Sequence, residues 1–239
     1  MPNSVWRTQR RAPGRGGLAT RGLRWPKVEG ASTAEWRSFL PITFGRAESM
    51  PLFDAPGATV TVEHMWINYV YFLDVVLPVV SQAVVKIALH PDDPPVPMLG
   101  GVARIFKSPE DFKRAWVRYR ENPAWGLDLC LGCCSEMPGG AANVREVIEI
   151  FGRKGRVLYV PFREVQGVVP DFVERFIGEG NFNAAEATAL LKTKGFTSFL
   201  LDDHVQQMDD DADSNHRGRA HAIGHMQGLL KMSEMAARS

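Results

Sequence analysis

Side chains of three types that bind metal ions stand at the ends of apolar segments far apart in the sequence. His90 lies in the run Lys86–Pro95, where apolar residues give way to a histidine, prolines and two aspartates. Cys130 ends a second apolar segment, and Asp203 ends another, with His204 beside it. A nitrogen, a sulfur and an oxygen donor together suit a divalent transition metal acting as a Lewis acid. A plainer alternative stays open, in which His90 caps its loop, Cys130 is a small buried hydrophobe and Asp203 caps a turn.

These side chains can meet only if the fold brings the ends of their strands together. The pattern of apolar residues predicts strands over Val84–His90, Leu127–Cys130, Arg156–Phe162 and Phe196–Asp202. It predicts helices over Thr61–Ala83, Ser108–Arg120, Val144–Phe151, Ala184–Lys194 and Arg219–Met235. Alternation of helix and strand favours an α/β fold with a parallel sheet, whose strands end at one edge. Because a complete TIM barrel has eight strands, we expect a partial (β/α)8 barrel of about four βα units.

The chain divides into two regions by composition. Residues 1–57 hold scattered arginines, glycines and prolines without a clear period, and we expect a loop-rich segment with a short helix near Ala34–Leu40. The arginines form either a solvated basic loop or a clamp for phosphate or carboxylate groups. Residues 58–239 carry the regular pattern and are predicted to form the barrel part.

The overall composition bounds the partners and the compartment. The chain has 239 residues, of which 45% are hydrophobic and 23% charged, and a net charge of +1, so neither nucleic acid nor an anionic membrane is an expected partner. No apolar stretch approaches the roughly 20 residues of a membrane span, and no secretory signal is evident. The three cysteines lie within Cys130–Cys134, too close together for a disulfide framework. A reduced, cytoplasmic setting is therefore expected.

Other polar motifs have simpler interpretations. The cysteine run Cys130–Cys134 invites a zinc site, but a zinc ribbon needs a second such pair or a nearby histidine pair, so we do not expect one. The acidic run Asp209–Asp213 is typical of a solvated loop, although it follows the last predicted strand and could border the site. His64 and His216 are interpreted as surface or packing residues.

Several segments together carry a family resemblance. They are Trp66–Tyr69, Lys86–Pro95, Gly126–Gly132, Val160–Val165, Val169–Phe172, Leu201–His204, Ala222–Gly224 and Met226–Gly228. These segments resemble the mannonate dehydratases, metal-dependent enzymes with a xylose-isomerase-like TIM barrel. Met1–Asn3 and Trp6–Thr8 are similar to the loop after the fourth strand of that family. The resemblance therefore implies a chain that begins in mid-barrel and lacks the first four strands.

The resemblance implies a lyase of hexuronate (glucuronate) catabolism, which dehydrates D-mannonate to 2-keto-3-deoxy-D-gluconate. The implied cofactor is Mn2+, with Fe2+ as the alternative, and its implied ligands are His90, Cys130 and Asp203. The metal would neutralise the negative charge that develops when a proton leaves C2 of the sugar acid.

Further residues acquire implied roles from the same resemblance. Arg104 and Arg163 are similar to contacts with the substrate carboxylate or hydroxyls, since a guanidinium fork suits a sugar acid. His204 and Arg163 are the implied catalytic residues. His221 joins them as a substitute for a tyrosine that the family has near Gly218.

One departure from the family pattern leaves rival functions open. Pro161 stands where the family has a histidine that binds the metal, and proline offers no ligand atom. The rivals are an inactive barrel remnant and a sugar isomerase or epimerase of the same superfamily. Because half a barrel leaves strand edges uncovered, we also expect the chain to fold poorly alone and to form a homo-oligomer.

Overall fold

A computed structural model describes residues 60–206, 208, 211 and 214–236 of the chain. The predicted loop-rich segment 1–57, its short helix near Ala34–Leu40 and most of the acidic run Asp209–Asp213 lie outside these residues.

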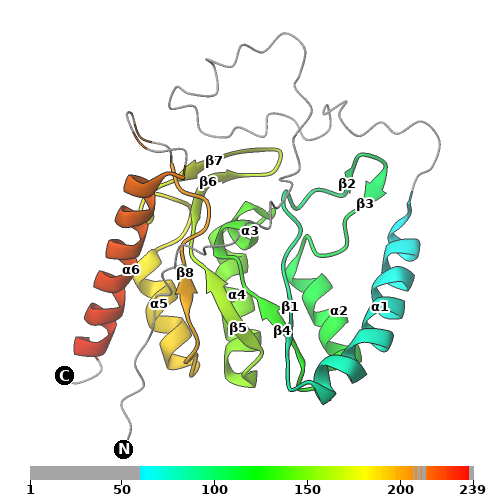
Figure 1. Cartoon of the computed structure of the whole chain (residues 1–239). Coiled ribbons are helices and arrows are strands. Elements are labelled where there is room, and N and C mark those ends of the chain that lie inside the picture. Colours follow the sequence, from blue (N-terminus) through cyan, green and yellow to red (C-terminus); the bar gives the residue numbers. More distant parts are fainter. Residues whose placement is uncertain (1–59, 207, 209–210, 212–213, 237–239) are drawn as a thin grey trace, which may run out of the picture.

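A four-stranded parallel sheet forms the centre of the described structure. It consists of β1 (Ile87–Leu89), β4 (Trp125–Asp128), β5 (Val157–Pro161) and β8 (Leu200–Leu201), in the order β1-β4-β5-β8. All three neighbouring pairs are parallel, so the carboxyl ends of the strands lie along one edge, the upper edge in Figure 1. β1, β5 and β8 lie within the predicted strands, whereas β4 begins two residues before the predicted Leu127–Cys130 and ends at Asp128. The predicted parallel α/β arrangement is confirmed.

Five long helices accompany the sheet and match the five predicted helices. They are α1 (Val62–Gln82), α2 (Pro109–Tyr119), α4 (Ala141–Phe151), α5 (Ala184–Thr193) and α6 (His216–Ala236). Local capping explains the start of α2, where the Ser108 hydroxyl accepts a hydrogen bond from the Asp111 N–H and Pro109 occupies the first helical position. The Asn183 side chain caps α5 in the same way, accepting from two backbone N–H groups.

The hydrophobic core lies between the sheet and these helices. Leu127 and Val160 of the sheet are at most 2% exposed and pack in one cluster with Ala115, Phe151 and Leu191 of the helices. Removing a side chain of this size from water contributes about 1.5–3 kcal/mol to folding. The packing of the helices against the sheet therefore fixes the positions of the strands and of the loops that follow them.

Several short elements were not predicted from the sequence, and all but one of them follow the ends of the sheet strands. They are the antiparallel pair β2 (Met98–Leu99) and β3 (Val102–Ala103), the helix α3 (Leu131–Glu136), the 3-10 turn η3 (Gly152–Lys154) and the hairpin of β6 (Glu164–Val168) and β7 (Asp171–Arg175). Figure 1 shows both pairs of strands and α3 at the edge where the sheet strands end. The backbone N–H of Val169, in the hairpin turn, donates to the carbonyl of Glu136, which ties the hairpin to α3.

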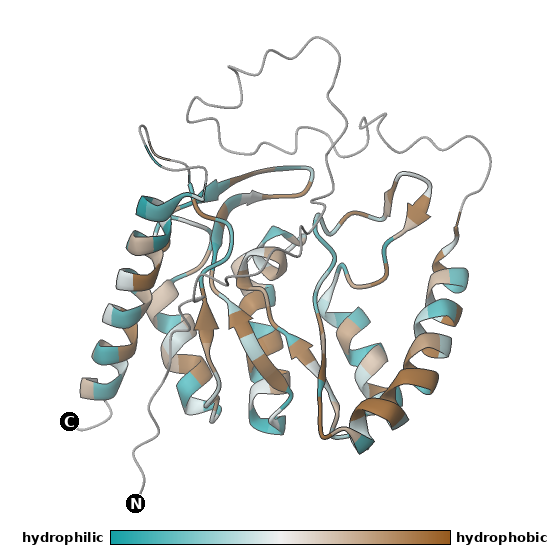
Figure 2. Cartoon of the chain, in the orientation of Figure 1, coloured by the Kyte–Doolittle hydropathy of each residue, from teal (hydrophilic) through white to brown (hydrophobic). Residues whose placement is uncertain are grey.

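Helix α1 corrects one expectation about apolar stretches. It has 21 residues and, by length and composition alone, is apolar enough to cross a membrane, and Figure 2 shows its hydrophobic colouring. Only 17% of its apolar window is buried in the described structure. Trp66, Leu73 and Leu77 of α1 are buried in the core cluster. Asp74 forms an ion pair with Arg118 of α2 at 2.7 Å.

Candidate metal centre

The three predicted metal ligands follow strands at the carboxyl edge of the sheet, where Cys130 lies close both to His90 and to Asp203. His90 follows β1, Cys130 follows β4 and Asp203 follows β8. The Cys130 Sγ lies 3.6 Å from Asp203 Oδ2. A ligand atom of His90 lies within 4.8 Å of the Sγ atoms of Cys130 and Cys133. The parallel sheet thus brings together donors that are separated by long stretches of sequence.

The surroundings of His90 prepare one ring nitrogen for a metal. Its Nδ1 lies 2.6 Å from the carbonyl oxygen of Pro91. Because a carbonyl oxygen can only accept, Nδ1 carries a hydrogen, and Nε2 is the nitrogen that can offer a lone pair. Burial lowers the pKa of His90, but the hydrogen bond and charge of Cys130 outweigh it and raise the pKa to about 9. A metal at Nε2 would therefore displace a proton.

The surroundings of Cys130 favour its thiolate form. Burial raises the pKa of its thiol, but this is outweighed by the hydrogen bond with Cys133 and by the positive charges of Arg163 and His90, so that the pKa falls well below its ordinary value. Cys130 is also the N-cap of α3, where its Sγ accepts a hydrogen bond from the Cys133 N–H at 3.4 Å. The thiolate is the form of cysteine that binds metals.

Asp203 completes a donor set that fits a divalent cation. Its side chain is 26% exposed. Burial, followed by the negative charge of Cys130, raises the pKa of Asp203 to about 6. A cation at this place would relieve the repulsion between the Asp203 carboxylate and the Cys130 thiolate. The imidazole, thiolate and carboxylate present here are the ligand types that transition metals use in proteins.

The strand between Cys130 and Asp203 in the sheet contributes no ligand. Pro161 is the last residue of β5 and is buried. Its neighbour Phe162 donates its backbone N–H to the carbonyl of Leu201 in β8, at 2.9 Å. The backbone at the end of β5 is thus committed to the sheet, and the pyrrolidine ring fills the position where a ligand side chain would stand.

Arg163, two residues further on, is the cationic centre of a buried carboxylate cluster. Its guanidinium lies 2.6 Å from Glu136, 2.6 Å from Glu174, 2.9 Å from Asp93 and 3.4 Å from Asp203. One positive charge cannot neutralise four carboxylates. Burial accordingly raises the pKa of Glu136 to about 8, although the charge of Arg163 opposes the shift. We conclude that Glu136 holds its proton through most of the neutral range.

The burial of Arg163 corrects its predicted role. Its side chain is only 1% exposed. A Cβ placed on Gly132 would lie 2.5 Å from its Cγ, so α3 passes directly over it. No surface of Arg163 is left for a substrate in this arrangement. Its position instead fits a residue that holds the neighbouring carboxylates and cysteines in place.

Arg104 supports the loop that carries His90. Its Nε lies 3.1 Å from Asp92 Oδ1, and its Nη2 donates to the carbonyl of Asp93 at 2.9 Å. The other oxygen of Asp92 accepts from the backbone N–H of Ile105 at 2.8 Å. The side chain of Arg104 remains 24% exposed, so part of the guanidinium stays accessible from solvent.

The two predicted catalytic histidines have different surroundings. His204 lies at the rim of the cluster, 46% exposed, with Nδ1 2.9 Å from Glu174 Oε1. That hydrogen bond is the main reason that the pKa of His204 is raised. His221 is exposed on α6, where its ring lies 4.9 Å from that of Phe176. Among the described residues, no hydrogen bond or ion pair joins His221 to the predicted metal ligands.

Three functional candidates escaped the sequence analysis. Cys133 was seen only as part of a cysteine run, Glu136 follows that run in α3, and Glu174 lies in β7. The acidic residues could be found only with the positions of α3 and the hairpin. The spacing of Cys130 and Cys133 was visible in the sequence, and its meaning depends on the neighbouring strands.

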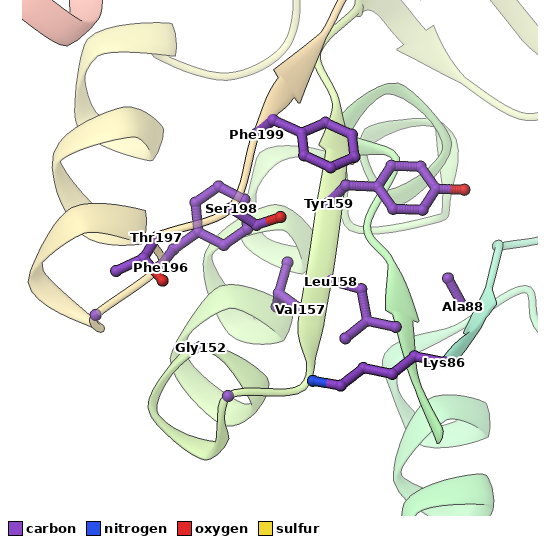
Figure 3. Close-up of a pocket in the computed structure, with 12 residues that line it drawn as sticks. Lys86, Ala88, Gly152, Val157, Leu158, Tyr159, Phe196, Thr197, Ser198 and Phe199 are labelled. Atoms are coloured by element: carbon purple, nitrogen blue, oxygen red, sulfur yellow. The ribbon is translucent and has the colours of Figure 1, made fainter. Parts of the chain in front are cut away.

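The best-defined cavity lies away from this cluster. It has a volume of about 420 Å3 and is lined by residues near the amino ends of the strands, including Lys86, Val157 and Thr197. Figure 3 shows the Lys86 side chain extending along this cavity, and the rings of Tyr159 and Phe199 side by side. Those rings are stacked with centroids 5.5 Å apart. Because barrel enzymes carry their chemistry at the carboxyl ends, this cavity is not the candidate site.

Comparison with known proteins agrees with the fold and the resemblance. The family model "D-mannonate dehydratase (UxuA)" matches residues 45–239. A mannonate dehydratase of Shouchella clausii is 29% identical over 188 residues, covering 75% of this chain and 50% of that protein. One from Thermotoga neapolitana is 34% identical over 120 residues, covering 50% and 30%.

A solved structure shows the same architecture. The mannonate dehydratase of Streptococcus suis serotype 2 matches with a TM-score of 0.66 at 22% identity, over 87% of this chain and 57% of that one. This likeness supports the partial barrel fold. The chain spans half the length, or less, of the curated relatives named here. With most of its length matched by the family model, the chain belongs to the D-mannonate dehydratase (UxuA) family.

Proposed function

We propose that this chain takes part in the metal-dependent dehydration of D-mannonate to 2-keto-3-deoxy-D-gluconate. The observation that carries the proposal is the position of Cys130 at the carboxyl edge of the sheet, near His90 on one side and Asp203 on the other, with His204 next to Asp203. Membership of the family supports the same substrate and a hydro-lyase activity. Because the chain spans only part of its relatives, the activity of the whole enzyme is a proposal for this chain.

His90, Cys130 and Asp203 would hold the ion. When bound, a divalent metal supplies Lewis acidity, which stabilises negative charge on the oxygens of a sugar acid. The family resemblance favours Mn2+ or Fe2+ at this place. The described residues support a divalent transition metal through their donor types and through the thiolate state of Cys130.

His204 is the proposed proton donor to the departing C3 hydroxyl. Glu174 accepts a hydrogen bond from its Nδ1 and favours the protonated ring. A protonated imidazole at the exposed rim can donate to a leaving group, which is the role of a general acid. Glu174 would act through His204 by fixing its orientation.

Arg104 remains the proposed contact for the substrate carboxylate. Its guanidinium is partly exposed while it braces the loop of His90. A guanidinium presents several N–H donors in one plane, so the pairing with Asp92 leaves donors for a second carboxylate. Arg163 is proposed to hold the surrounding carboxylates and Cys133 in position.

The assembly is proposed to be a homo-oligomer in the cytoplasm. Within the described residues, β1 and β8 each pair with one strand only, so each leaves one edge without a partner strand. A second copy could cover such edges. The cytoplasmic setting rests on the three reduced, buried cysteines.

Activity tests separate this function from its rivals. The full 239-residue chain, loaded with Mn2+ or Fe2+, is incubated with D-mannonate, with other aldonates and with aldose sugars. Formation of a 2-keto-3-deoxy acid from D-mannonate supports the dehydratase, and its loss in His204→Gln supports the assigned acid. Isomerised sugar in place of the keto acid would support the isomerase, and no turnover by a folded, metal-loaded chain would support the inactive remnant.

A further inference from the structure

Cys133 lies beside the candidate metal centre and has no role in the function proposed above. It follows Cys130 at a spacing of three residues, in the first turn of α3. Its backbone N–H donates to Cys130 Sγ at 3.4 Å. This local arrangement places both thiols on the same side of the turn, with each Sγ within 4.8 Å of the other and of a ring nitrogen of His90. Both cysteines are 0% exposed.

The centre lacks one ligand for a protein-held ion. His90, Cys130 and Asp203 come from the ends of β1, β4 and β8, whereas β5 ends in Pro161, which has no donor atom. Ions bound only by three protein donors keep an open coordination position. The sheet strands supply no fourth protein donor, whereas α3 provides one in Cys133.

We infer that Cys133 is the fourth protein ligand of the metal centre, so that the donor set of this chain is one imidazole, two thiolates and one carboxylate. This inference rests on the metal site proposed above and adds a residue to it. The two thiolates come from a single turn of α3, and His90 and Asp203 supply the other half of the set from distant strands.

Cys133 also belongs to a second group of possible metal ligands, but Arg163 already contacts every member of that group. Cys133 also lies with Asp93 and Glu136 in a set whose ligand atoms are within 4.8 Å of one another. The Arg163 Nη2 lies 2.9 Å from Asp93, 2.6 Å from Glu136 and 3.2 Å from Cys133 Sγ. An ion there would have to displace a buried guanidinium. Within the inferred donor set Arg163 contacts Cys133 and, at 3.4 Å, Asp203, and among the described residues no ion pair joins it to His90 or Cys130.

Without a metal, Cys133 is favoured as the neutral thiol. Burial, followed by the hydrogen bond and the charge of Cys130, raises the pKa of the Cys133 thiol well above its ordinary value, although the charge of Arg163 opposes the shift. A divalent ion between the two sulfurs would reverse the effect of the Cys130 charge, and coordinating thiols lose their protons on binding. The guanidinium would then face a thiolate across 3.2 Å, a charge-assisted contact.

The second thiolate changes the ion that the centre prefers. Soft sulfur donors select Zn2+, whereas Mn2+ prefers oxygen donors. We therefore expect Zn2+ to be favoured over the Mn2+ implied by the family resemblance. Because Zn2+ is usually four-coordinate, four protein ligands would leave it no vacant position unless it expands to five. Zn2+ should accordingly bind more tightly than it supports turnover.

X-ray absorption of Zn2+ bound to the full chain tests this assignment. The inferred set predicts two sulfur neighbours at about 2.3 Å from the zinc. Cys133→Ser and Cys133→Ala should each retain one sulfur. Cys134→Ser is the matched control, because Cys134 is equally buried but packs in the hydrophobic core cluster, and it should retain both.

Competition between metals gives a second measurement. In equilibrium dialysis, the preference for Zn2+ over Mn2+ should fall about tenfold or more in Cys133→Ser, by the magnitude expected for losing a metal contact. A single sulfur in the wild-type spectrum would overturn the assignment of Cys133 and leave the proposed centre of His90, Cys130 and Asp203 standing. Absence of any sulfur, or of any bound zinc, would overturn both.

Discussion

At the scale of single residues, the chemistry of the site depends on one buried arginine that contacts several acidic side chains and a cysteine at once. Arg163 faces four carboxylates and also the sulfur of Cys133. The side chain was predicted from the sequence as a substrate contact, because its residue type suits a sugar acid. Its burial depends on α3 and on the hairpin β6–β7, which the sequence did not reveal. The residues at the strand ends were easier to predict, since each follows an apolar run directly.

Replacing Arg163 should disrupt the cluster more than the loss of one contact would. Arg163→Met leaves buried carboxylates without a cation, and breaking a buried pair in this way costs about 3–5 kcal/mol of unfolding free energy. Arg163→Lys keeps the charge but loses the planar fork, so it should recover part of that loss. Chemical denaturation of the metal-free chains measures both. Equal stability of Arg163→Met and the wild type would contradict the cluster.

The protonation of Glu136 predicts a dependence of stability on pH. Its pKa rises from the ordinary value of 4.5 to about 8 in the folded chain. The folded state therefore binds the proton more tightly, and its stability should fall as the pH rises from about 4.5 towards 8 and level off above that. Glu136→Gln, which cannot ionise, should gain stability relative to wild type over the same interval.

Denaturation of the metal-free chain at a series of pH values checks this. The exposed Glu121, replaced by Gln, is the control and should show little difference from wild type. A difference between Glu136→Gln and wild type that stays constant from pH 5 to pH 9 would contradict the shifted pKa.

Pro161 provides a gain-of-binding test at the same scale. It ends β5 between the strands that carry Cys130 and Asp203. Pro161→His adds an imidazole at this edge, so the affinity for Mn2+ should rise about tenfold or more, as expected for a restored metal contact. Calorimetric titration measures it on folded protein. Unchanged Mn2+ affinity would argue against the proposed coordination at this edge.

At the scale of elements, the sequence predicted those helices and strands whose formation depends on neighbouring residues in the chain. The capping of α2 by Ser108 and the apolar runs of the sheet strands are visible in the sequence, and these elements were found. The hairpin β6–β7 was missed because distant contacts stabilise it. The Asn181 side chain, for example, donates to the carbonyls of Gly167 and Ser135. Glu174 comes to the site on this hairpin, so its role could not be predicted either.

The hairpin should tolerate only glycine at position 167, which lies in β6 opposite Phe172. Gly167 has a φ of +96°, and an added Cβ would lie 2.4 Å from the carbonyl oxygen of Asp171. Gly167→Ala should therefore lower the unfolding free energy by about 1–3 kcal/mol and reduce activity through Glu174. Gly155→Ala is the matched control, because Gly155 has a φ of +62° but no atom within 4 Å of the added Cβ.

Gly155→Ala should therefore cost only about 1 kcal/mol, the backbone penalty by itself. Denaturation curves of both variants measure the difference. If the two substitutions lower the unfolding free energy equally, then the close approach between position 167 and the carbonyl oxygen of Asp171 is not the reason for the glycine.

At the scale of the whole molecule, apolar side chains and strand edges are uncovered within the part of the chain that the structure describes. Tyr71, Val75 and Val79 of α1 are more than half exposed, and β1 and β8 each have one unpaired edge among the described residues. Exposed apolar faces and free strand edges promote association between chains. The sequence predicted uncovered strand edges because it indicated only four βα units, and the described residues form a parallel sheet of four strands.

Self-association of the purified chain follows from these surfaces. Sedimentation velocity at micromolar concentration should show dimers or larger species, and thermal unfolding should depend on protein concentration. Tyr71→Glu places a charge on the exposed apolar face of α1 and should weaken the association. Glu121→Gln removes a charge from an exposed polar residue and should leave the association unchanged. A sharp, concentration-independent melt of a monomer would contradict this expectation.

The central claim is that the carboxyl edge of the sheet binds a divalent ion through His90, Cys130 and Asp203. Equilibrium dialysis of the folded chain against Mn2+ and Zn2+, followed by elemental analysis, tests it most directly. The account predicts about one ion per chain for wild type and for Cys134→Ser, and an affinity lower by about tenfold to a hundredfold or more for Cys130→Ser. Equal metal content in Cys130→Ser and Cys134→Ser at limiting metal would contradict it.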